Sequence, residues 1–331
     1  MPGRTVAGEP RLSELRARTL ELLARWRDAG GSAPAQLSAE DLERVFAASE
    51  FAAGAAIREP ALLTDLTAGG ELGRARAAGE IRARAMALLE AGNDEAGFMD
   101  LLRRLRRREM VRIAWRDLTG AAPVAEVLTE LSDLADAAIE SALAFASHSL
   151  AARYGQPRSA TGELQELVVL AMGKLGGREL NFSSDIDLVL LYPESGETDG
   201  RRPIANEDYF TRLGQALVRL LNAHTAEGFV FRMDLRLRPF GDSGPLVVNF
   251  GAFEEYLQKH GRDWERYAYV KARAVTGVPA YRMLYDEVVR PFVYRRYLDF
   301  GVFESLRDMK EMIAREVARR DLQEDIKLGP G

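Results

Sequence analysis

The stretch GKLGGRELNFSSDIDLVLLY, residues 173–192, limits more than any other what this chain can fold into. The apolar run LVVLAM at 167–172 precedes it, and its last seven residues, IDLVLLY at 186–192, form a second aliphatic run. Short apolar runs bounded by turn residues are typical of buried strands. The sequence therefore predicts two buried strands joined by a glycine-containing turn.

Two aspartates, Asp185 and Asp187, stand where the second predicted strand begins. Because side chains alternate along a strand, both carboxylates project from the same face. Two negative charges this close repel each other and raise one pKa unless a cation lies between them. The 331 residues include no cysteine and only three histidines. A metal here must therefore be bound by oxygen ligands, which favours magnesium or manganese.

The segment GFVFRMDLRLRPFG, residues 228–241, predicts a half-buried strand that Pro239 ends, because apolar and polar residues alternate strictly over 231–238. Its polar face contains one acid, Asp234, among arginines. Asp234 completes a three-carboxylate cluster with Asp185 and Asp187 if the two strands are neighbours in one sheet. The alternative is an ion-paired strand face without catalytic meaning.

The glycine turn offers a candidate phosphate site. Backbone N–H groups near Gly173, Gly176 and Gly177 can point at a phosphate with no side chain in the way, and Lys174 adds a positive charge. The spacing matches neither a P-loop nor GxGxxG. Ser184 either donates to a phosphate oxygen or caps local backbone. A glycine cluster between strands is also, very often, only a tight turn.

The chain is expected to be mostly helical with an α+β core. Residues 1–155 predict a helical amino-terminal domain, 156–250 a catalytic core, and 251–331 a helical segment that reads as truncated. Within the last segment, one helix is predicted from four apolar residues at helical spacing: Leu306, Met309, Ile313 and Val317. Asn206 is expected to cap a helix, and the polar loop 194–203 is expected to be mobile.

Charge and hydropathy exclude several classes of partner. The net charge of −5 gives no global basic field, so nucleic acid is not an expected partner. The basic run RRLRRR at 103–108 is interpreted as a solvated helix face rather than a nucleic-acid site. Neither a signal peptide nor an apolar run long enough to span a membrane is present in the sequence, so a cytoplasmic protein is predicted.

Lys271 and Arg273 are weaker candidates for phosphate binding. They follow the aromatic residues of GRDWERYAYVKAR and stand two positions apart. A lysine and an arginine this close are frequent in any helix, so the pair carries little information by itself.

Several long motifs closely resemble the amino-terminal half of the bacterial bifunctional glutamine synthetase adenylyltransferase/adenylyl-removing family. They are GKLGGRELNFSSDIDLVLLY, FTRLGQALVRLL, GFVFRMDLRLRPFGDSGPLV, GRDWERYAYVKARAV, RPFVYRRYLDF and MIAREVARR. Members of that family carry two nucleotidyltransferase-like domains. The versions NFSSDIDL and GRDWERYAYVKAR look like the adenylyl-removing copy, since the adenylylating copy usually reads more like PGSDLDL. In that family the polypeptide also continues beyond the position of the segment IKLGPG.

The resemblance implies a nucleotidyltransferase fold of the DNA polymerase beta type, with a small mixed sheet flanked by helical domains. By position, the family's metal-binding acids are Asp185, Asp187 and Asp234, with Mg²⁺ or Mn²⁺ as cofactor. The phosphate cradle corresponds to Gly173, Lys174, Gly176, Gly177 and Ser184. Arg236 either receives the incoming phosphate or only pairs with Asp234.

The reaction that the resemblance implies is phosphorolysis of the AMP-tyrosine bond on glutamine synthetase, which releases ADP. Adenylylated glutamine synthetase, the PII signal protein, nucleotide and phosphate are the implied partners. Two alternatives stay open. One is ATP-dependent adenylyl transfer onto glutamine synthetase, and the other is a catalytically silent module that senses nucleotide or PII.

Overall fold

The computed structural model describes residues 9–92 and 94–294, and beyond these residues 307, 310–312, 314–315 and 319. The described chain divides into two compact units. Unit 1 takes its residues from 1–145, 178–184 and 217–232, and unit 2 from 146–177, 185–216 and 233–331. The four apolar residues of the helix predicted beyond 300 (Leu306, Met309, Ile313 and Val317) lie outside the described residues.

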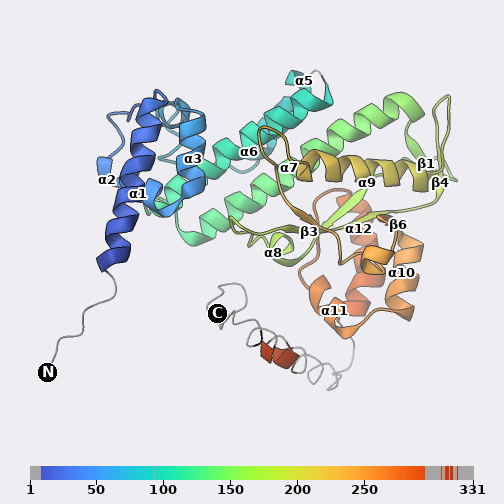
Figure 1. Cartoon of the computed structure of the whole chain (residues 1–331). Coiled ribbons are helices and arrows are strands. Elements are labelled where there is room, and N and C mark those ends of the chain that lie inside the picture. The colour runs from blue at the N-terminus through green and yellow to red at the C-terminus, as the bar shows by residue number, and fades with distance from the viewer. Residues whose placement is uncertain are drawn as a thin grey trace. The chain divides into compact units, whose positions relative to one another are not determined.

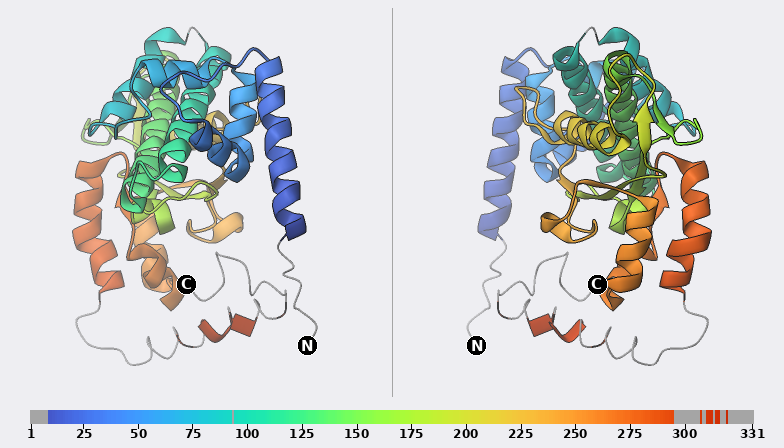
Figure 2. Two further views of the ribbon diagram at one scale, coloured as in Figure 1. Left: turned by 90° about the vertical axis from the view of Figure 1, so that its left-hand side faces the viewer. Right: turned by 90° about the vertical axis from the view of Figure 1, so that its right-hand side faces the viewer.

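Unit 1 is built from helices, as the sequence predicts (Figure 1). They are α1 (Glu9–Asp28), α2 (Ala39–Ala48), α3 (Glu50–Arg58), α4 (Leu62–Ala68), α5 (Glu80–Ala91), α6 (Glu95–Leu118) and the first part of α7 (Val124–Tyr154). Side chains of Ser38, Ser49 and Asp94 accept backbone N–H groups at the starts of α2, α3 and α6. Figure 2 shows α1 packed beside α2 and α3, and these helices bury a core around Trp26 and Phe46.

The basic run 103–108 is not the solvated helix face that we expected. Arg103 is buried, and its guanidinium donates to the backbone carbonyls of Met99 (2.9 Å), Gly228 (2.8 Å) and Ala223. Arg107 is also buried and forms an ion pair with Glu227 at 2.7 Å. The expectation rested on the local alternation of leucines and arginines, whereas several partners of these arginines lie more than a hundred positions away.

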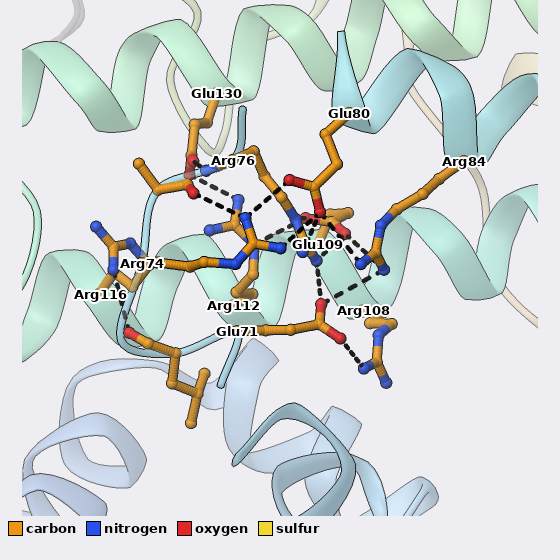
Figure 3. Close-up of polar contacts among 12 residues, drawn as sticks. Glu71, Arg74, Arg76, Glu80, Arg84, Arg108, Glu109, Arg112, Arg116 and Glu130 are labelled. Carbon is orange, nitrogen blue, oxygen red and sulfur yellow. Dashed lines mark hydrogen bonds and ion pairs between the residues drawn. The ribbon is translucent and has the colours of Figure 1, made fainter. Parts of the chain in front are cut away.

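A buried network of arginines and glutamates ties the 69–79 loop to the helices of unit 1 (Figure 3). Glu109 has no exposed side-chain area and accepts hydrogen bonds from Arg76 (2.6 Å) and Arg112 (2.8 Å). Arg112 also donates to Glu130 at 2.6 Å. Because each buried charge has an opposite partner, the cost of removing the charges from water is offset within the network.

Unit 2 holds the predicted sheet. Its strands are β1 (Pro157–Ser159), β2 (Val168–Ala171), β3 (Ile186–Tyr192), β4 (Gly196–Thr198), β5 (Met233–Asp234), β6 (Val247–Asn249) and β7 (Arg273–Ala274). The five-stranded sheet runs β5-β3-β2-β7, with β6 also paired to β3. β3 is antiparallel to β2 and parallel to β5 and β6. The predicted α+β class with a mixed sheet is therefore confirmed.

The helical elements of unit 2 are mostly short. They are α8 (Gly173–Gly176), α9 (Asn206–Asn222), whose last residues belong to unit 1, the 3-10 turn η1 (Gly241–Ser243), α10 (Phe250–Lys259), α11 (Asp263–Tyr269), α12 (Val278–Leu284), the π-helical turn η2 (Tyr285–Val289) and α13 (Arg290–Val293). Buried residues of β2 and β3 pack against α10, α11 and α12 through Phe253, Tyr269 and Tyr281. In the described part of the chain, no helix is long and apolar enough to cross a membrane.

Two expectations for unit 2 are wrong. The strand predicted over 228–238 is reduced to β5. Asp234 accepts the N–H of Arg236 and so turns the backbone out of the sheet after β5. The segment 194–203, expected to be a loop, contains β4, which pairs with β1, and Asp199 accepts the N–H of Gln156 at 2.7 Å, while its mobility stays a prediction. In addition, β7 joins the sheet from outside the expected core of 156–250.

The helix predicted from Asn206 is present as α9, but the expected cap is not: α9 begins at Asn206 itself, and among the described residues its side-chain Oδ1 has no hydrogen-bond partner. Its amide nitrogen donates to the carbonyls of Arg158 (2.9 Å) and Glu194 (3.1 Å). The fully buried side chain thereby ties the start of α9 to β1 and to the segment just after β3.

Candidate functional site

The three acids singled out in the sequence lie near one end of β3, two of them directly opposite each other. Asp187 is the second residue of β3 and lies directly opposite Asp234 of the parallel strand β5. Residues opposite each other in neighbouring strands point to the same face of a sheet. Asp185 precedes β3 by one position, and its charge acts on Asp187. The two strands are therefore neighbours, as a three-carboxylate cluster requires.

Burial of Asp187 is the largest electrostatic effect at the site, and crowding of negative charge adds to it. Burial raises the pKa of the Asp187 carboxyl, and the charges of Asp234 and Asp185 raise it further. The charges of Arg236 and Lys174 act in the opposite direction but do not cancel the rise. A half-buried carboxylate that is held against two others is favoured by any cation that enters between them.

Asp234 is occupied by its neighbour Arg236. The guanidinium Nε of Arg236 lies 3.0 and 2.9 Å from the two carboxylate oxygens, and the backbone N–H of Arg236 donates to Oδ1 at 2.9 Å. The hydrogen bond from Arg236 lowers the pKa of Asp234, although burial works against it. Two roles were considered for Arg236: binding the incoming phosphate and pairing with Asp234. The structure contains the ion pair with Asp234.

The three carboxylates are not arranged to bind one metal ion together. Among the described residues, no group of three or more acids or histidines is arranged to hold a metal ion. The ion pair between Arg236 and Asp234 gives a physical reason, because one of the three acids is held by a cation from the chain itself. The donor chemistry nevertheless fits a hard divalent cation, since all three groups are carboxylates.

The glycine stretch is a single helical turn, α8, rather than an open loop. Gly176 and Gly177 donate their N–H groups to the carbonyls of Met172 (2.9 Å) and Gly173 (3.1 Å), so these two amides are used within the turn. A Cβ on Gly176 would lie 2.2 Å from the carbonyl oxygen of Lys271. Gly176 therefore serves close packing of α8 against the segment before β7.

Gly173 and Lys174 lie at the acid site itself. Gly173 has φ +53°, a left-handed conformation, and a Cβ there would lie 2.7 Å from Oδ2 of Asp187. Lys174 contributes a positive charge that lowers the pKa of Asp187 against the effect of burial. The start of α8 thus leaves room for the Asp187 carboxylate and brings one cation to it.

Ser184 is placed less favourably for phosphate binding than the sequence suggested. Its hydroxyl donates to the side-chain oxygen of Asn181 at 2.6 Å, and its N–H donates to the carbonyl of Asn181. The residue belongs to unit 1, whereas the three acids belong to unit 2. In the described structure the Ser184 hydroxyl therefore closes a local turn through the side chain of Asn181 and does not cap backbone, while its role in phosphate binding stays a prediction.

Arg273 is more important to the site than its sequence context suggested. It lies in β7, and its guanidinium donates to the carbonyl of Leu175 in α8 at 3.1 Å. Together with the close approach of Lys271 to Gly176, this contact fixes the glycine turn against the sheet. The only sequence signal was the spacing of two basic residues after an aromatic segment, which does not reveal that β7 pairs with β2 beside α8.

Gly173→Ala is expected to lower stability and to disturb Asp187 together. A left-handed backbone costs a residue with a Cβ about 1–2 kcal/mol, so the free energy of unfolding in urea should fall by about that amount. Gly162→Ala is the matched control, because Gly162 has φ +87° and nothing within 4 Å of an added Cβ. The pKa of Asp187 from NMR titration should change only in Gly173→Ala; an unchanged value would contradict the steric role of Gly173.

Comparison with known proteins shows which family the chain resembles over most of its length. The family model described as glutamate-ammonia ligase adenylyltransferase matches residues 39–287, which include all three acids and the glycine turn. The bifunctional glutamine synthetase adenylyltransferase/adenylyl-removing enzyme of Thioalkalivibrio sulfidiphilus is 56% identical over 292 residues, 88% of this chain and 30% of the relative. Its counterparts from Nitrosococcus oceani and Pseudomonas aeruginosa are 53% and 51% identical over 87% and 88% of this chain. The chain spans about 30% of the length of these relatives.

Proposed function

Because the chain belongs to the glutamate-ammonia ligase adenylyltransferase family, we propose that it removes AMP from adenylylated glutamine synthetase by phosphorolysis, giving ADP and unmodified enzyme. The main observation behind the proposal is that Asp187 and Asp234 lie directly opposite each other on the neighbouring parallel strands β3 and β5, with Asp185 just before β3. The motif NFSSDIDL supports the removing direction, because it resembles the adenylyl-removing copy of the family.

In this reaction an oxygen of inorganic phosphate attacks the phosphorus of the AMP-tyrosine linkage. A P–O–P bond forms, the bond from phosphorus to the tyrosine oxygen breaks, and that oxygen takes up a proton. Phosphate is already anionic at neutral pH, so it needs little help from a general base. The larger obstacle is to bring two anions together. We therefore assign the aspartates to a metal and not to proton abstraction.

Mg²⁺ or Mn²⁺ is the proposed cofactor, held by Asp185, Asp187 and Asp234. Support comes from the all-carboxylate donor set and from the raised pKa of Asp187, because a cation would relieve the repulsion that raises it. When bound, a divalent metal supplies neutralisation of charge on the phosphoryl oxygens. Asp234 can serve as a ligand only after Arg236 releases it.

We propose that the two cationic side chains of the site, Lys174 and Arg236, bind the incoming phosphate. Lys174 stands at the start of α8, where its charge already acts on Asp187. Arg236 has a side chain that is 73% exposed, so its guanidinium can leave Asp234 without breaking the core. Gly173 leaves space for Asp187, whereas Gly176 and Gly177 support packing and the turn rather than the phosphate.

Arg236→Gln is expected to raise the KM for phosphate by about tenfold or more, with a smaller effect on kcat. The reason is that one charge-assisted contact to phosphate is lost while the aspartates remain. Steady-state kinetics at varied phosphate measures both constants. Arg202→Gln, which changes an exposed arginine of the same unit, is the control. An unchanged KM for phosphate would leave Arg236 with the ion pair alone.

The proposal implies two protein partners: adenylylated glutamine synthetase as substrate and the PII signal protein as regulator. Incubation of the chain with adenylylated glutamine synthetase, phosphate and Mg²⁺ should lower the mass of the synthetase subunit by one adenylyl group. Full retention of that mass, with synthetase shown to be bound, would favour a silent module.

Adenylyl transfer from ATP is the second candidate, because the names of the relatives include that activity. Unmodified glutamine synthetase and ATP labelled in the adenosine distinguish the two. Phosphorolysis predicts that this chain puts no label on the synthetase, whereas transfer predicts a labelled synthetase subunit.

A further inference from the structure

Unit 1 contains a cavity of ≈ 400 Å³ that plays no part in the acid site. It lies along α6 and is bordered by the start of α3 and by the segment just before Ser184. Its lining includes one cation among mostly apolar side chains: Phe51, Arg106, Met110, Ala114, Phe182 and Ser183. All of them belong to unit 1, and the volume is in the range of small-molecule sites. We refer to it as the Arg106 cavity.

Arg106 is an unusual arginine for a folded protein. Its guanidinium carbon lies 5.1 Å from the ring centre of Phe51 and 5.3 Å from that of Phe229. Its Nε is buried, and within the described residues that nitrogen has no hydrogen-bond partner. The Nε of Arg107 is likewise buried without a partner, but other nitrogens of the Arg103 and Arg107 guanidinium groups bond to backbone carbonyls and to Glu227.

No negatively charged group is among the causes of the pKa shift of Arg106. Burial lowers the pKa of Arg106 to about 10, and the like charge of Arg107 adds to the effect. The side chain therefore still carries a positive charge at neutral pH. Two acids border the cavity elsewhere: Glu50 forms an ion pair with Arg18, and Asp117 lies eleven positions along α6, about 16 Å away. Neither is among the charges that shift Arg106.

The walls of the cavity are largely apolar beside this cation. Met110 and Ala114 follow Arg106 at four-residue intervals on the same face of α6, and Phe51 and Phe182 face the cavity from α3 and from the 178–184 segment. A ligand that fits has one anionic group for Arg106 and an apolar body for the rest. Inorganic phosphate fits less well, because several of its oxygens would be buried against apolar side chains without donors.

From this arrangement we infer that the Arg106 cavity binds a small organic carboxylate, with the carboxylate on Arg106 and the apolar part along Met110 and Ala114. The inference does not depend on the proposed reaction. Its position suits a regulatory site, since Ser183 stands two positions before Asp185 in the chain. The carbonyl of Ser183 also accepts a hydrogen bond from Arg232 at 3.0 Å, and Arg232 stands two positions before Asp234.

The test uses the full 331-residue chain with 3-phenylpropionate, straight-chain carboxylates from butyrate to octanoate, the neutral 3-phenylpropanamide, and inorganic phosphate as probes. Calorimetric titration and thermal unfolding are the readouts. At least one carboxylate should bind saturably and raise the Tm, whereas the neutral amide should do neither. Phosphate, which is also the proposed substrate at the acid site, should bind equally to the unmodified chain and to Arg106→Met. Loss of the charge-assisted contact in Arg106→Met should weaken binding at least about tenfold.

Arg106→Met also separates a binding role from a structural one. Because methionine keeps an aliphatic side chain between Phe51 and Phe229 but removes the uncompensated charge, the Tm without ligand should stay equal or rise. Arg106→Lys, which keeps the charge, should retain part of the binding. Arg104→Met, at an exposed site on the same helix, should leave binding unchanged.

Three results would overturn the inference. One is that no carboxylate of the series binds the unmodified chain. The second is that the neutral amide binds as well as the carboxylates do, or that Arg106→Met loses phosphate binding together with carboxylate binding. The third is that Arg106→Met binds the carboxylate with unchanged affinity.

Discussion

Asp187→Asn is expected to lower the rate of ADP release by about 10³-fold or more and, at the same time, to make the metal-free protein more stable. Loss of one carboxylate from a site that stabilises phosphoryl charge removes several kcal/mol of transition-state stabilisation, and each 1.36 kcal/mol is about tenfold in rate. The gain in stability has a separate cause, because the folded protein disfavours the charged form of Asp187.

The pH dependence follows from the direction of that shift. Burial, Asp234 and Asp185 raise the folded-state pKa of Asp187 above its unfolded value. The unfolded chain therefore releases this proton first as pH rises, and the folded protein loses stability between the two pKa values. The asparagine of Asp187→Asn does not titrate, so the variant does not lose this stability as pH rises. The Tm advantage of Asp187→Asn in EDTA should be present at pH 7 and should disappear below about pH 4.

Metal binding gives the matching test for Asp187. Mg²⁺ should raise the Tm of the unmodified protein, since it relieves the repulsion, and should have little effect on Asp187→Asn. Asp208→Asn, which changes an exposed acid in the first turn of α9, is the control and should respond to Mg²⁺ like the unmodified protein. A Tm of Asp187→Asn below that of the unmodified protein at pH 7 in EDTA would contradict the account of charge crowding.

Glu109→Gln is expected to cost about 3–5 kcal/mol of unfolding free energy, the range for breaking a buried ion pair from one side. Glu109 has no exposed side-chain area, and Arg76 and Arg112, which it accepts from, are 2% and 0% exposed (Figure 3). Glutamine keeps the shape but removes the charge, so two buried guanidinium groups lose their shared partner. Urea denaturation followed by circular dichroism measures the loss.

The control for the network is an exposed ion pair in the same unit. Glu40 pairs with Arg44 across one turn of α2 at 2.7 Å, and both side chains are solvent-exposed. Exposed pairs of this kind contribute about 0.3–0.5 kcal/mol, so Glu40→Gln should change stability by no more than that. Equal effects of Glu40→Gln and Glu109→Gln would mean that the buried network does not hold the 69–79 loop.

Glu71 of the same network is expected to make unit 1 sensitive to acid. Burial alone would raise the pKa of Glu71, but hydrogen bonds from Arg108 and Arg76 bring it below its ordinary value. A carboxyl with a lowered folded-state pKa contributes stability above its unfolded pKa and loses it as pH falls through the lower value. Part of the acid sensitivity of unit 1 should therefore disappear in Glu71→Gln.

Much of the sheet and of the acid site could be predicted from local patterns. The apolar run after Asp185 is β3 from Ile186 to Tyr192, and its partner run is β2. Alternation along 231–238 identified Asp234 as the acid on a polar strand face. Strand pairing and register depend on which residues are buried together, so a single sequence could not decide whether Asp187 lies opposite Asp234.

The errors arise where long-range partners override local pattern. Arg103 looked like a solvated residue of a basic run, but carbonyls near residue 225 accept its hydrogen bonds. The strand through Asp234 ends early because Arg236 donates to the Asp234 carboxylate. Loop 194–203 contains a strand because β1, some forty positions earlier, pairs with it. None of these partners is visible in sequence periodicity.

The most direct test of the central proposal is the fate of labelled inorganic phosphate. The chain is incubated with adenylylated glutamine synthetase, Mg²⁺ and phosphate labelled with ³²P, beside the Asp187→Asn variant. Phosphorolysis at the acid site predicts that label appears in ADP with the unmodified chain and is lost with the variant. Release of unlabelled AMP, or equal labelling of ADP by the variant, would contradict the account.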